Sequence, residues 1–398
     1  MKSTAIWSFL GLLFLVGIFF QIYLLSAFVV MLGLVGGLAR WWQRHALDQV
    51  SYRRKFYYRR GFPGELISTQ VEVENDKFLP VSWLRIRDAW PVSVGPEEEE
   101  ALQPTHDPKT GSLVNLFSLR WFERSRRSYQ ILLRERGVYS LGPVRFQSGD
   151  LFGWFQDQRQ VENRDTLTVF PSLLPFSELH LPADDPFGER RARRRLYEDP
   201  NQPMGVRDYH PEDDFRRVHW PATAHTGQLQ VKVYQPVSAQ VLVVCLNVST
   251  FHHYWEGMDT RLLEHLIRVT ATLVQKGIED GFRVGLLSNG CLAHSDQPFR
   301  IPPGRSPHQL GHLLETLSAV TPLVTSSFER LLMKEGPRLP FGARLVIVTG
   351  INSPELGATL MRLHQSGREI TLLSFAKEPP EKLPGIRTIH VPFLEQDA

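Results

Sequence analysis

The chain has 398 residues, of which 42% are hydrophobic and 22% are charged. This composition excludes a disordered chain, and the length allows two or three domains of ordinary size. The formal net charge of +3 is small, so general nucleic-acid binding is not expected. The only two cysteines, Cys245 and Cys291, argue against a disulfide framework and fit a reducing compartment for the soluble part.

The first segment of the chain is apolar. Residues 6–39 hold no charged side chain and consist mainly of Leu, Phe, Val, Ile and Gly. A bilayer-spanning helix needs about 20 apolar residues, so this run is too long for one span and just long enough for two short ones. We therefore predict a transmembrane helical hairpin in residues 1–45, with Gln21 at its turn. The alternatives are one long tilted span and a cleaved signal peptide, whose apolar core is about 7–15 residues long.

Basic residues flank this apolar run on both sides. Lys2 precedes it, and Arg40 and Arg44 follow it closely. Short flanks rich in Lys and Arg remain on the cytoplasmic side of a membrane. Both ends of a hairpin satisfy this rule together, and Trp41 and Trp42 occupy interfacial positions. We predict a cell-membrane protein with a two-span anchor and its soluble domains in the cytoplasm.

Residues 46–175 alternate between apolar and polar side chains with period two. The clearest short runs are 65–74, 81–87, 116–121, 129–134 and 144–146. Turn-forming residues separate these runs, and no convincing amphipathic helix pattern interrupts them. The pattern predicts a β-sandwich domain that is immunoglobulin-like.

The period changes in residues 237–398. Residues 241–246 form a continuous apolar run, which is typical of a buried parallel strand. Further strands are predicted at 282–287, 343–348, 370–375 and 386–391, and helices at 259–276, 307–319, 327–334 and 355–365. Strands that alternate with helices indicate a doubly wound α/β domain with a parallel sheet.

Residues 176–236 are polar and irregular, and they are predicted to be a basic linker. Five arginines lie within residues 190–195. A solvated charged linker explains this cluster most simply. Anionic lipid headgroups, an acidic partner or nucleic acid would also suit it.

The densest group of charged and aromatic side chains lies at the end of this linker. Its candidate functional residues are Arg207, Tyr209, Asp213, Arg216, Arg217, Trp220 and Lys232. One hypothesis is an interdomain lock, in which the charged groups pair with each other and with the β-domain above the aromatic rings. A second is a docking surface, because Arg, Tyr and Trp are common binding anchors. Catalysis is a third, but the segment has neither a known metal-ligand spacing nor a nucleophile, so no catalytic residue is predicted.

This segment resembles the domain-of-unknown-function 58 family, and the resemblance extends over nearly the whole chain. The family pattern is matched by Arg207, Tyr209, Pro211, Asp213, Arg216, Arg217, Trp220, Ala224, Gly227, Leu229 and Lys232. Glu212, His219 and His225 depart from it. The resemblance implies a C-terminal domain similar to a von Willebrand factor A domain, which is Rossmann-like. It also implies an accessory role beside a MoxR-type AAA+ ATPase.

Domains of the von Willebrand A type often bind Mg²⁺ or Mn²⁺ through an Asp-x-Ser-x-Ser motif after the first strand and an Asp after the fourth. Here Asn247 replaces the first Asp, Ser249 is retained, Phe251 replaces the second Ser, and Gly350 lies where the later Asp is expected. Hard cations require oxygen ligands and benefit from carboxylate charge. The resemblance therefore implies a degenerate metal-site edge at these four positions, with neither metal nor cofactor.

Two functions from different classes remain. The first is a non-enzymatic, membrane-anchored interaction or scaffold protein that works beside a MoxR-type ATPase. The alternative is a metal-dependent hydrolase at the cytoplasmic membrane face. The missing carboxylates at Asn247 and Gly350 favour the first, and the chain has no Gly-rich phosphate-binding loop. We expect no enzymatic activity. The expected partners are the membrane and the MoxR-type ATPase.

Overall fold

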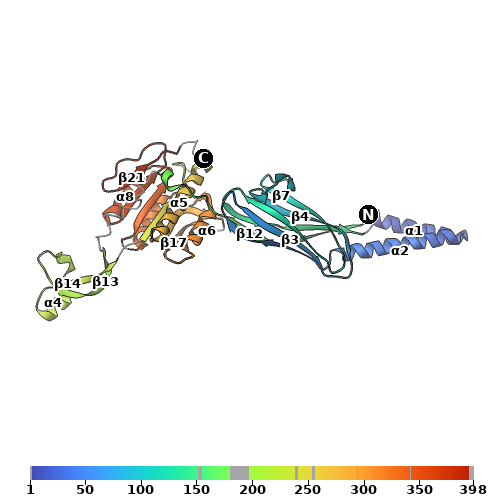
Figure 1. The fold of residues 1–398 in the computed structure, drawn as a ribbon, viewed down its shortest axis with the longest axis horizontal. Helices are drawn as coiled ribbons and strands as arrows, with labels where there is room; N and C mark the ends of the chain where they lie inside the picture. Colours follow the sequence, from blue (N-terminus) through green and yellow to red (C-terminus); the bar gives the residue numbers. More distant parts are fainter. Residues whose placement is uncertain are drawn as a thin grey trace. The chain divides into compact units, whose positions relative to one another are not determined.

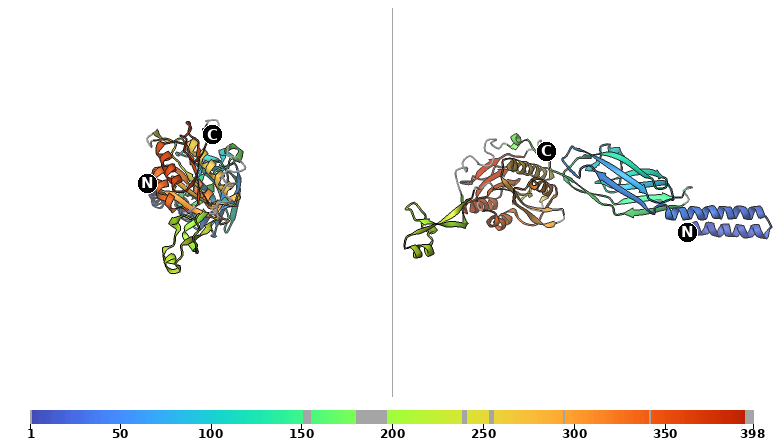
Figure 2. Two further views of the ribbon diagram at one scale, coloured as in Figure 1. Left: turned by 90° about the vertical axis from the view of Figure 1, so that its left-hand side faces the viewer. Right: turned by 60° about the horizontal axis from the view of Figure 1, so that its bottom comes forward.

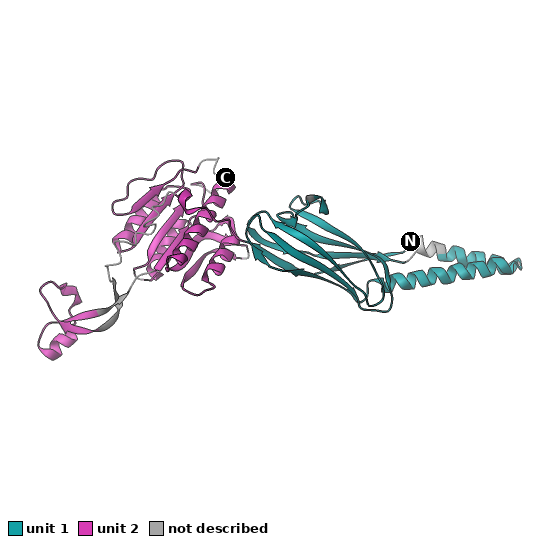
Figure 3. Cartoon of the chain, in the orientation of Figure 1, with its two compact units in different colours: residues 1–169 teal, residues 170–398 magenta. Residues whose placement is uncertain are grey.

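The structure is a computed structural model that describes residues 2–150, 155–179, 197–237, 241–252, 256–293, 295–340 and 342–393. The chain divides into two compact units, Met1–Val169 and Phe170–Ala398 (Figure 3). The arginine cluster at 190–195 lies outside the described residues.

Two helices, α1 (Lys2–Phe19) and α2 (Tyr23–Ala46), begin the first unit and lie side by side (Figures 1 and 2). Gln21, in the turn between them, has a positive φ of 53°. By length and composition α2 is long and apolar enough to cross a membrane, and α1 contains a shorter apolar stretch, Trp7–Phe19. An apolar helix near the N-terminus is therefore present, whereas the two-span anchor stays a prediction.

The rest of the first unit, here called the β-domain, contains three sheets. The first has the strand order β1 (Val50–Phe56), β3 (Leu66–Asn75), β8 (Arg124–Leu133) and β5 (Val94–Pro96). The second has β11 (Gln156–Val161), β10 (Val144–Gly149), β4 (Val81–Pro91), β7 (Thr110–Leu119) and β6 (Leu102–Pro104). The third has β2 (Arg60–Gly61), β12 (Asp165–Val169) and β9 (Gly137–Leu141). The predicted period-two runs lie in these strands.

The first two sheets share an apolar core. Val71 and Val73 of β3 pack in one buried cluster with Leu84 and Ile86 of β4 and with Phe146 of β10. Alternate residues of each strand enter this cluster because successive side chains of a strand point to opposite faces of the sheet. This shared core explains why the sequence of the β-domain alternates with period two.

The second unit contains a mixed sheet with the strand order β17-β16-β15-β19-β20-β21. Its strands are β15 (Val241–Leu246), β16 (Arg283–Leu292), β17 (Ser295–Gly304), β18 (Val320–Val324), β19 (Arg344–Thr349), β20 (Glu369–Ser374) and β21 (Arg387–His390). Neighbouring pairs from β16 to β21 are parallel, whereas β17 and β18 pair with β16 in the antiparallel direction. The predicted α/β region with parallel strands is confirmed.

Helices cover both faces of this sheet (Figure 1). They are α5 (Thr260–Glu279), α6 (Gln309–Ser318), α7 (Phe328–Glu335) and α8 (Pro354–Gln365). Val243 of β15 packs in one cluster with Phe328 of α7 and Leu360 of α8. Its neighbour Leu242 points to the other face, where a Cβ atom at Gly277 of α5 would lie 2.6 Å from Leu242 Cδ2. Both faces of β15 are therefore buried, as its continuous apolar run requires.

A hairpin occupies much of the stretch that was expected to be an irregular linker. It consists of β13 (Tyr197–Asp208), the short helices η3 (Phe215–Arg217) and α4 (Trp220–Thr226), and β14 (Gln230–Val237). Gly227 ends α4 in the left-handed conformation, with φ of 71°. Residues 230–233 of β14 alternate between polar and apolar side chains, whereas β13 shows no such alternation, so the sequence gives little sign of the pairing.

Candidate functional site

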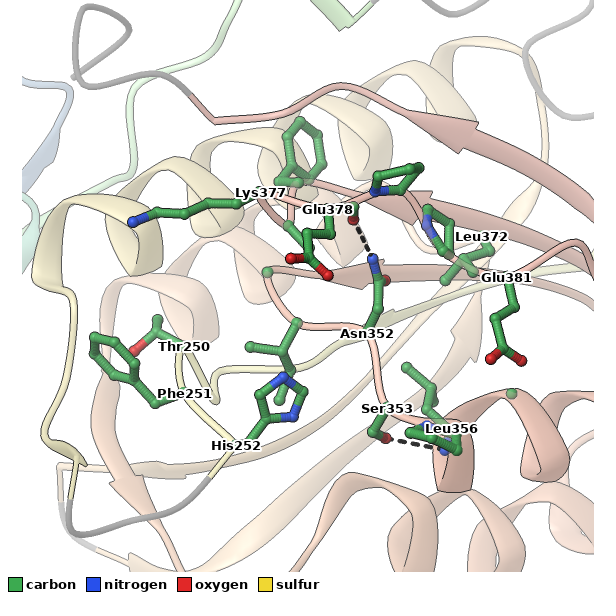
Figure 4. A pocket seen from close by; sticks show the side chains of 18 of the residues that line it. Thr250, Phe251, His252, Asn352, Ser353, Leu356, Leu372, Lys377, Glu378 and Glu381 are labelled. Carbon is green, nitrogen blue, oxygen red and sulfur yellow. Dashed lines mark hydrogen bonds between the residues drawn. The ribbon is translucent and has the colours of Figure 1, made fainter.

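A pocket of about 560 Å³ lies at the carboxyl edge of the parallel sheet. The chain leaves β15 toward α5 on one face, and it leaves β19 toward α8 on the other. The crevice between two neighbouring strands whose following connections go to opposite faces is the usual ligand site of open α/β sheets. Figure 4 shows its three contributing segments: Phe251 and His252 follow β15, Asn352 and Ser353 follow β19, and Glu378 and Glu381 follow β20. We call it the switch-point pocket.

Two buried asparagines organise the strand ends beside this pocket. Asn247 Oδ1 accepts hydrogen bonds from Asn289 Nδ2 at 3.0 Å and from the Ser249 backbone N–H at 3.1 Å. Asn247 Nδ2 donates to Thr349 Oγ1 at 3.2 Å. Asn289 Oδ1 in turn accepts from the Val248 N–H at 2.9 Å. Asn289 lies on β16 and was missed in the sequence, where nothing links it to the two loop segments.

This network does not fit a hard divalent cation. Asn247 is only 1% exposed, and both polar atoms of its side chain already have partners within the protein. All the groups are neutral, so they offer no carboxylate charge to offset the lost hydration of Mg²⁺. At Gly350 a Cβ atom would lie 2.8 Å from Leu262 Cδ2, so an acidic side chain at this position would require the Leu262 side chain to move. The structure brings Asn247 and Ser249 together, while Phe251 and Gly350 line the pocket.

Several polar side chains of the pocket wall serve local structure. Asn352 Nδ2 donates to the Glu378 carbonyl at 2.7 Å, and Asn352 Oδ1 accepts from Ser374 Oγ at 2.8 Å. Ser353 Oγ accepts from the Leu356 N–H at 3.1 Å and thereby caps α8. The polar groups of Asn352 and Ser353 already have partners within the protein, so a ligand would meet mainly the apolar side chains and the charged groups of the wall.

The apolar part of the wall includes Leu356, Leu372 and Phe375, and Phe251 is 40% exposed at the pocket. Lys377 and Glu381 supply charges of both signs among the lining residues. The two lining hydroxyls of Thr250 and Ser353 donate to Met258 Sδ and to Glu329 Oε1 respectively. Neither hydroxyl is paired with a histidine, as an activated nucleophile would be.

The hairpin segment carries the second group of candidate residues. Arg207 donates to both oxygens of Asp213, at 2.7 and 2.6 Å, and Asp213 also accepts from the His210 N–H at 2.9 Å. The Arg207 hydrogen bonds, followed by the His210 amide, lower the pKa of Asp213 from 3.8 to about 2. The predicted lock paired Asp213 with Arg216 and Arg217; here its partner is Arg207.

The aromatic residues of this segment are largely exposed. The rings of Tyr209 and Phe215 meet edge to face with centroids 5.7 Å apart. Trp220 is the first residue of α4 and is 62% exposed, so it does not pack beneath the charged groups as the lock hypothesis required. Arg216 and Arg217 are exposed in η3, and Lys232 lies on β14 opposite Val206.

The family model described as "Protein of unknown function DUF58" matches residues 205–391. The predicted resemblance to the DUF58 family is confirmed for this part of the chain. The DUF58 match includes the hairpin segment from Gly205 onward and the residues of the switch-point pocket apart from Phe393, whereas the β-domain and the N-terminal helices lie outside it.

A curated relative, the "Uncharacterized protein YeaD" of Bacillus subtilis, is 24% identical over 328 residues, which is 80% of this chain and 74% of YeaD. Among solved structures, a CARDB domain from Pyrococcus furiosus matches 30% of this chain and 91% of its own chain, with 13% identity and a TM-score of 0.20. A PapD-like domain of human CEP192 matches 31% of this protein and 85% of its own chain, with 16% identity and a TM-score of 0.18. Scores this low carry no argument about fold or function.

Outside the DUF58 match, the protein also contains a buried ionic cluster that the sequence did not reveal. In the β-domain, Arg54 donates to both oxygens of Asp88, at 2.7 and 2.6 Å, and both side chains are 0% exposed. Tyr52 and Trp90 donate to Asp88 as well, at 2.5 and 2.8 Å. Burial, followed by the neighbouring Asp88 charge, raises the pKa of Tyr52. One feature of the sequence could have indicated this cluster: Asp88 lies between Ile86 and Trp90 at an inward-facing position of an alternating strand.

Proposed function

We propose that this DUF58 protein is a membrane-anchored interaction protein whose soluble domains face the cytoplasm. Its α/β domain is von Willebrand factor A-like, and its β-domain is an immunoglobulin-like sandwich. The strand order of the α/β sheet, with antiparallel β17 at one edge, supports the first assignment. The shared core of two facing sheets supports the second. In this proposal the α1–α2 pair crosses the membrane as a two-span anchor.

The observation that carries the proposal is the chemistry of the switch-point pocket. The side chains of Asn352 and Ser353 are engaged with the protein itself, and the surface left for a ligand combines apolar side chains with the charged groups of Lys377 and Glu381. A partner segment with one apolar side chain between charged residues would fill such a pocket. Apolar and aromatic anchors that enter a preformed pocket contribute most of the binding energy of a protein interface.

The partner proposed for this site is a MoxR-type AAA+ ATPase, which rests on the family resemblance. The alternative function, a metal-dependent hydrolase at the cytoplasmic membrane face, needs a charged donor set. Asn247 and Asn289 supply only neutral amide groups that bind each other. We therefore prefer an accessory role in binding to a role in catalysis.

The test compares two variants of the full-length protein, tagged at the C-terminus, in binding to the purified MoxR-type ATPase of the same organism. Phe251→Ser removes an aromatic ring that is 40% exposed at the pocket. Leu323→Ser removes an apolar side chain of the same domain that is 50% exposed on β18 and serves as the matched control. We expect the first variant to weaken binding at least tenfold and the second to leave it unchanged. Equal binding by both variants, or no binding by the parent protein, would refute the proposal.

A further inference from the structure

Three aromatic side chains lie exposed at one end of the β-domain. Phe78 follows β3 and is 75% exposed, while Trp121 and Phe122 follow β7 and are 57% and 63% exposed. The rings of Phe78 and Trp121 stack with centroids 5.6 Å apart and planes 8° from parallel. These three residues form what we call the aromatic cluster. Large aromatic side chains gathered in this way mark a contact surface rather than ordinary exposed residues.

Hydrogen bonds tie the aromatic cluster to the C-terminal end of α2. Lys77 Nζ donates to the Ala46 carbonyl at 2.6 Å and also to the Asp48 carbonyl. The Asp76 N–H donates to the Gln49 carbonyl at 3.0 Å, and the Phe122 N–H donates to the Lys77 carbonyl at 3.2 Å. Both aromatic loops are therefore held beside the last turn of the helix.

A third loop of the β-domain contacts the same end of α2. The Arg40 guanidinium lies over the ring of Phe155, 5.3 Å from its centroid, and Gln43 Nε2 donates to the Gln156 carbonyl at 3.1 Å. The end of the β-domain that carries the aromatic cluster is thus the end attached to the apolar helix.

The aromatic cluster lies beside the part of α2 that is expected at the membrane interface. Trp41, which is 51% exposed, lies five residues before Ala46. At 1.5 Å per residue this separation is about 8 Å along the helix axis. Aromatic residues at the end of a spanning helix lie at the level of the lipid headgroups. The loops bonded to Ala46 and Gln49 are close enough to this level for their aromatic rings to reach it.

The backbone of the cluster is strained at one residue. Phe122 has a positive φ of 52°, a conformation that bulky residues rarely adopt. The loop retains it through the Arg120 N–H, which donates to Glu123 Oε2 at 2.5 Å, and through the Asn75 N–H, which donates to the Glu123 carbonyl at 2.9 Å. Backbone strain maintained by neighbouring hydrogen bonds is common at sites of function.

We propose that Phe78, Trp121 and Phe122 insert into the interfacial region of the lipid bilayer and dock the β-domain onto the membrane surface. This inference rests on the membrane anchoring in the proposed function. It adds a second contact with the lipid, made by a soluble domain beside the helices. The ligand is the boundary between headgroups and acyl chains, where aromatic side chains of peripheral proteins are buried.

The test measures the depth of single nitroxide labels in the full-length protein, reconstituted in phosphatidylcholine–phosphatidylglycerol vesicles. The native thiols Cys245 and Cys291 are both 0% exposed and should not take up the label. The test labels are placed by Trp121→Cys and, in a separate protein, by Phe78→Cys. Val92→Cys is the aqueous control: it is 39% exposed at the opposite end of β4, roughly 35 Å away at 3.3 Å per residue. Leu34→Cys on α2, which is 69% exposed, is the control for anchoring.

We expect labels at 121 and 78 to collide more with oxygen and less with an aqueous nickel chelate than the label at 92. The inference would be overturned if the labels at 121 and 78 had the same accessibility to both reagents as the label at 92. If the label at 34 then still reported hydrocarbon, the anchor would remain supported. A label at 34 that reports water would instead overturn the anchor, and the inference with it. Shielding of 121 and 78 from both reagents would indicate a protein contact and would also overturn the lipid assignment.

Discussion

The guanidinium of Arg207 binds both carboxylate oxygens of Asp213, with N–O distances of 2.7 and 2.6 Å. Arg207 lies near the end of β13, and Asp213 lies in the turn that leads to η3. The pair closes the loop that presents Tyr209 and Phe215. A bidentate pair of this kind fixes orientation as well as distance, so it determines which side chains the hairpin segment exposes.

Asp213→Ala should loosen this loop without unfolding the α/β domain. The substitution removes the acceptor for Arg207 and for the His210 amide, whereas the apolar core of the domain lies elsewhere. We expect faster hydrogen exchange in residues 209–217 and an unchanged melting temperature. Glu212→Ala, at an exposed neighbouring position, is the control and should change neither. A large fall in melting temperature for Asp213→Ala would mean that the loop supports the whole domain.

The same pair should respond to acid in a defined range. The pKa of Asp213 is lowered in the folded protein, from 3.8 to about 2, chiefly by Arg207. For a carboxyl group with a lowered pKa, the stabilisation is complete above the unfolded value and is lost as the pH falls through the folded one. The carboxyl carbon resonance of Asp213 should therefore titrate near 2, and Arg207→Ala should move the midpoint up toward 3.8. A midpoint near 3.8 in the parent protein would contradict the pairing.

Asp88→Ala should destabilise the β-domain severely. The substitution leaves the fully buried Arg54 without its main partner, although Asp165 Oδ2 still lies 2.9 Å from Arg54 Nη1. Removing one partner of a buried ion pair costs about 3–5 kcal/mol. Pulse proteolysis of the full-length protein across a urea series would measure the loss of stability.

Two further variants control this experiment. Glu162→Ala breaks an ion pair with Arg164 in which both side chains are more than half exposed, and it should change little. The double variant Arg54→Met with Asp88→Leu should recover part of the loss, since apolar replacement of a buried pair is often tolerated. A double variant no more stable than Asp88→Ala would show that the hydrogen bonds of Tyr52 and Trp90 to Asp88 matter more than the charges.

Gly350→Asp should not create a magnesium site. A Cβ atom at this position would lie 2.8 Å from Leu262 Cδ2, and overpacking of this kind costs about 1–3 kcal/mol. We expect a lower melting temperature that millimolar Mg²⁺ does not restore. Gly357→Ala is the matched control, because its Cβ would meet Leu383 Cδ2 at an ordinary 3.4 Å. Recovery of stability in Mg²⁺ would revive the hydrolase alternative.

Local sequence patterns predicted the strands and helices that are defined by residues close together in the sequence. The apolar run 241–246 coincides with β15, because a strand buried on both faces needs a continuous apolar run. Helices α5, α7 and α8 begin directly after Asp259, Ser327 and Ser353, whose side chains accept backbone N–H groups of the first turn.

Other elements follow from contacts between residues far apart in the sequence. The first half of β8 is polar and was not predicted as strand; Arg124 and Arg126 there pair with Glu74 and Glu72 on β3, at 2.6 and 2.9 Å. Opposite charges across two strands contribute to a sheet as apolar pairs do, but they leave no apolar alternation to detect.

By itself, the sequence determined the apolar N-terminal segment, the change of period from the β-domain to the α/β domain, and the missing carboxylates at Asn247 and Gly350. Only the tertiary structure decided that Asn289 completes the amide network beside the pocket, and that the aromatic cluster lies at the end of α2. The physical reason is that periodicity and capping depend on neighbours within a few residues. A binding surface depends on which distant segments meet, and that is set by the packing of the whole domain.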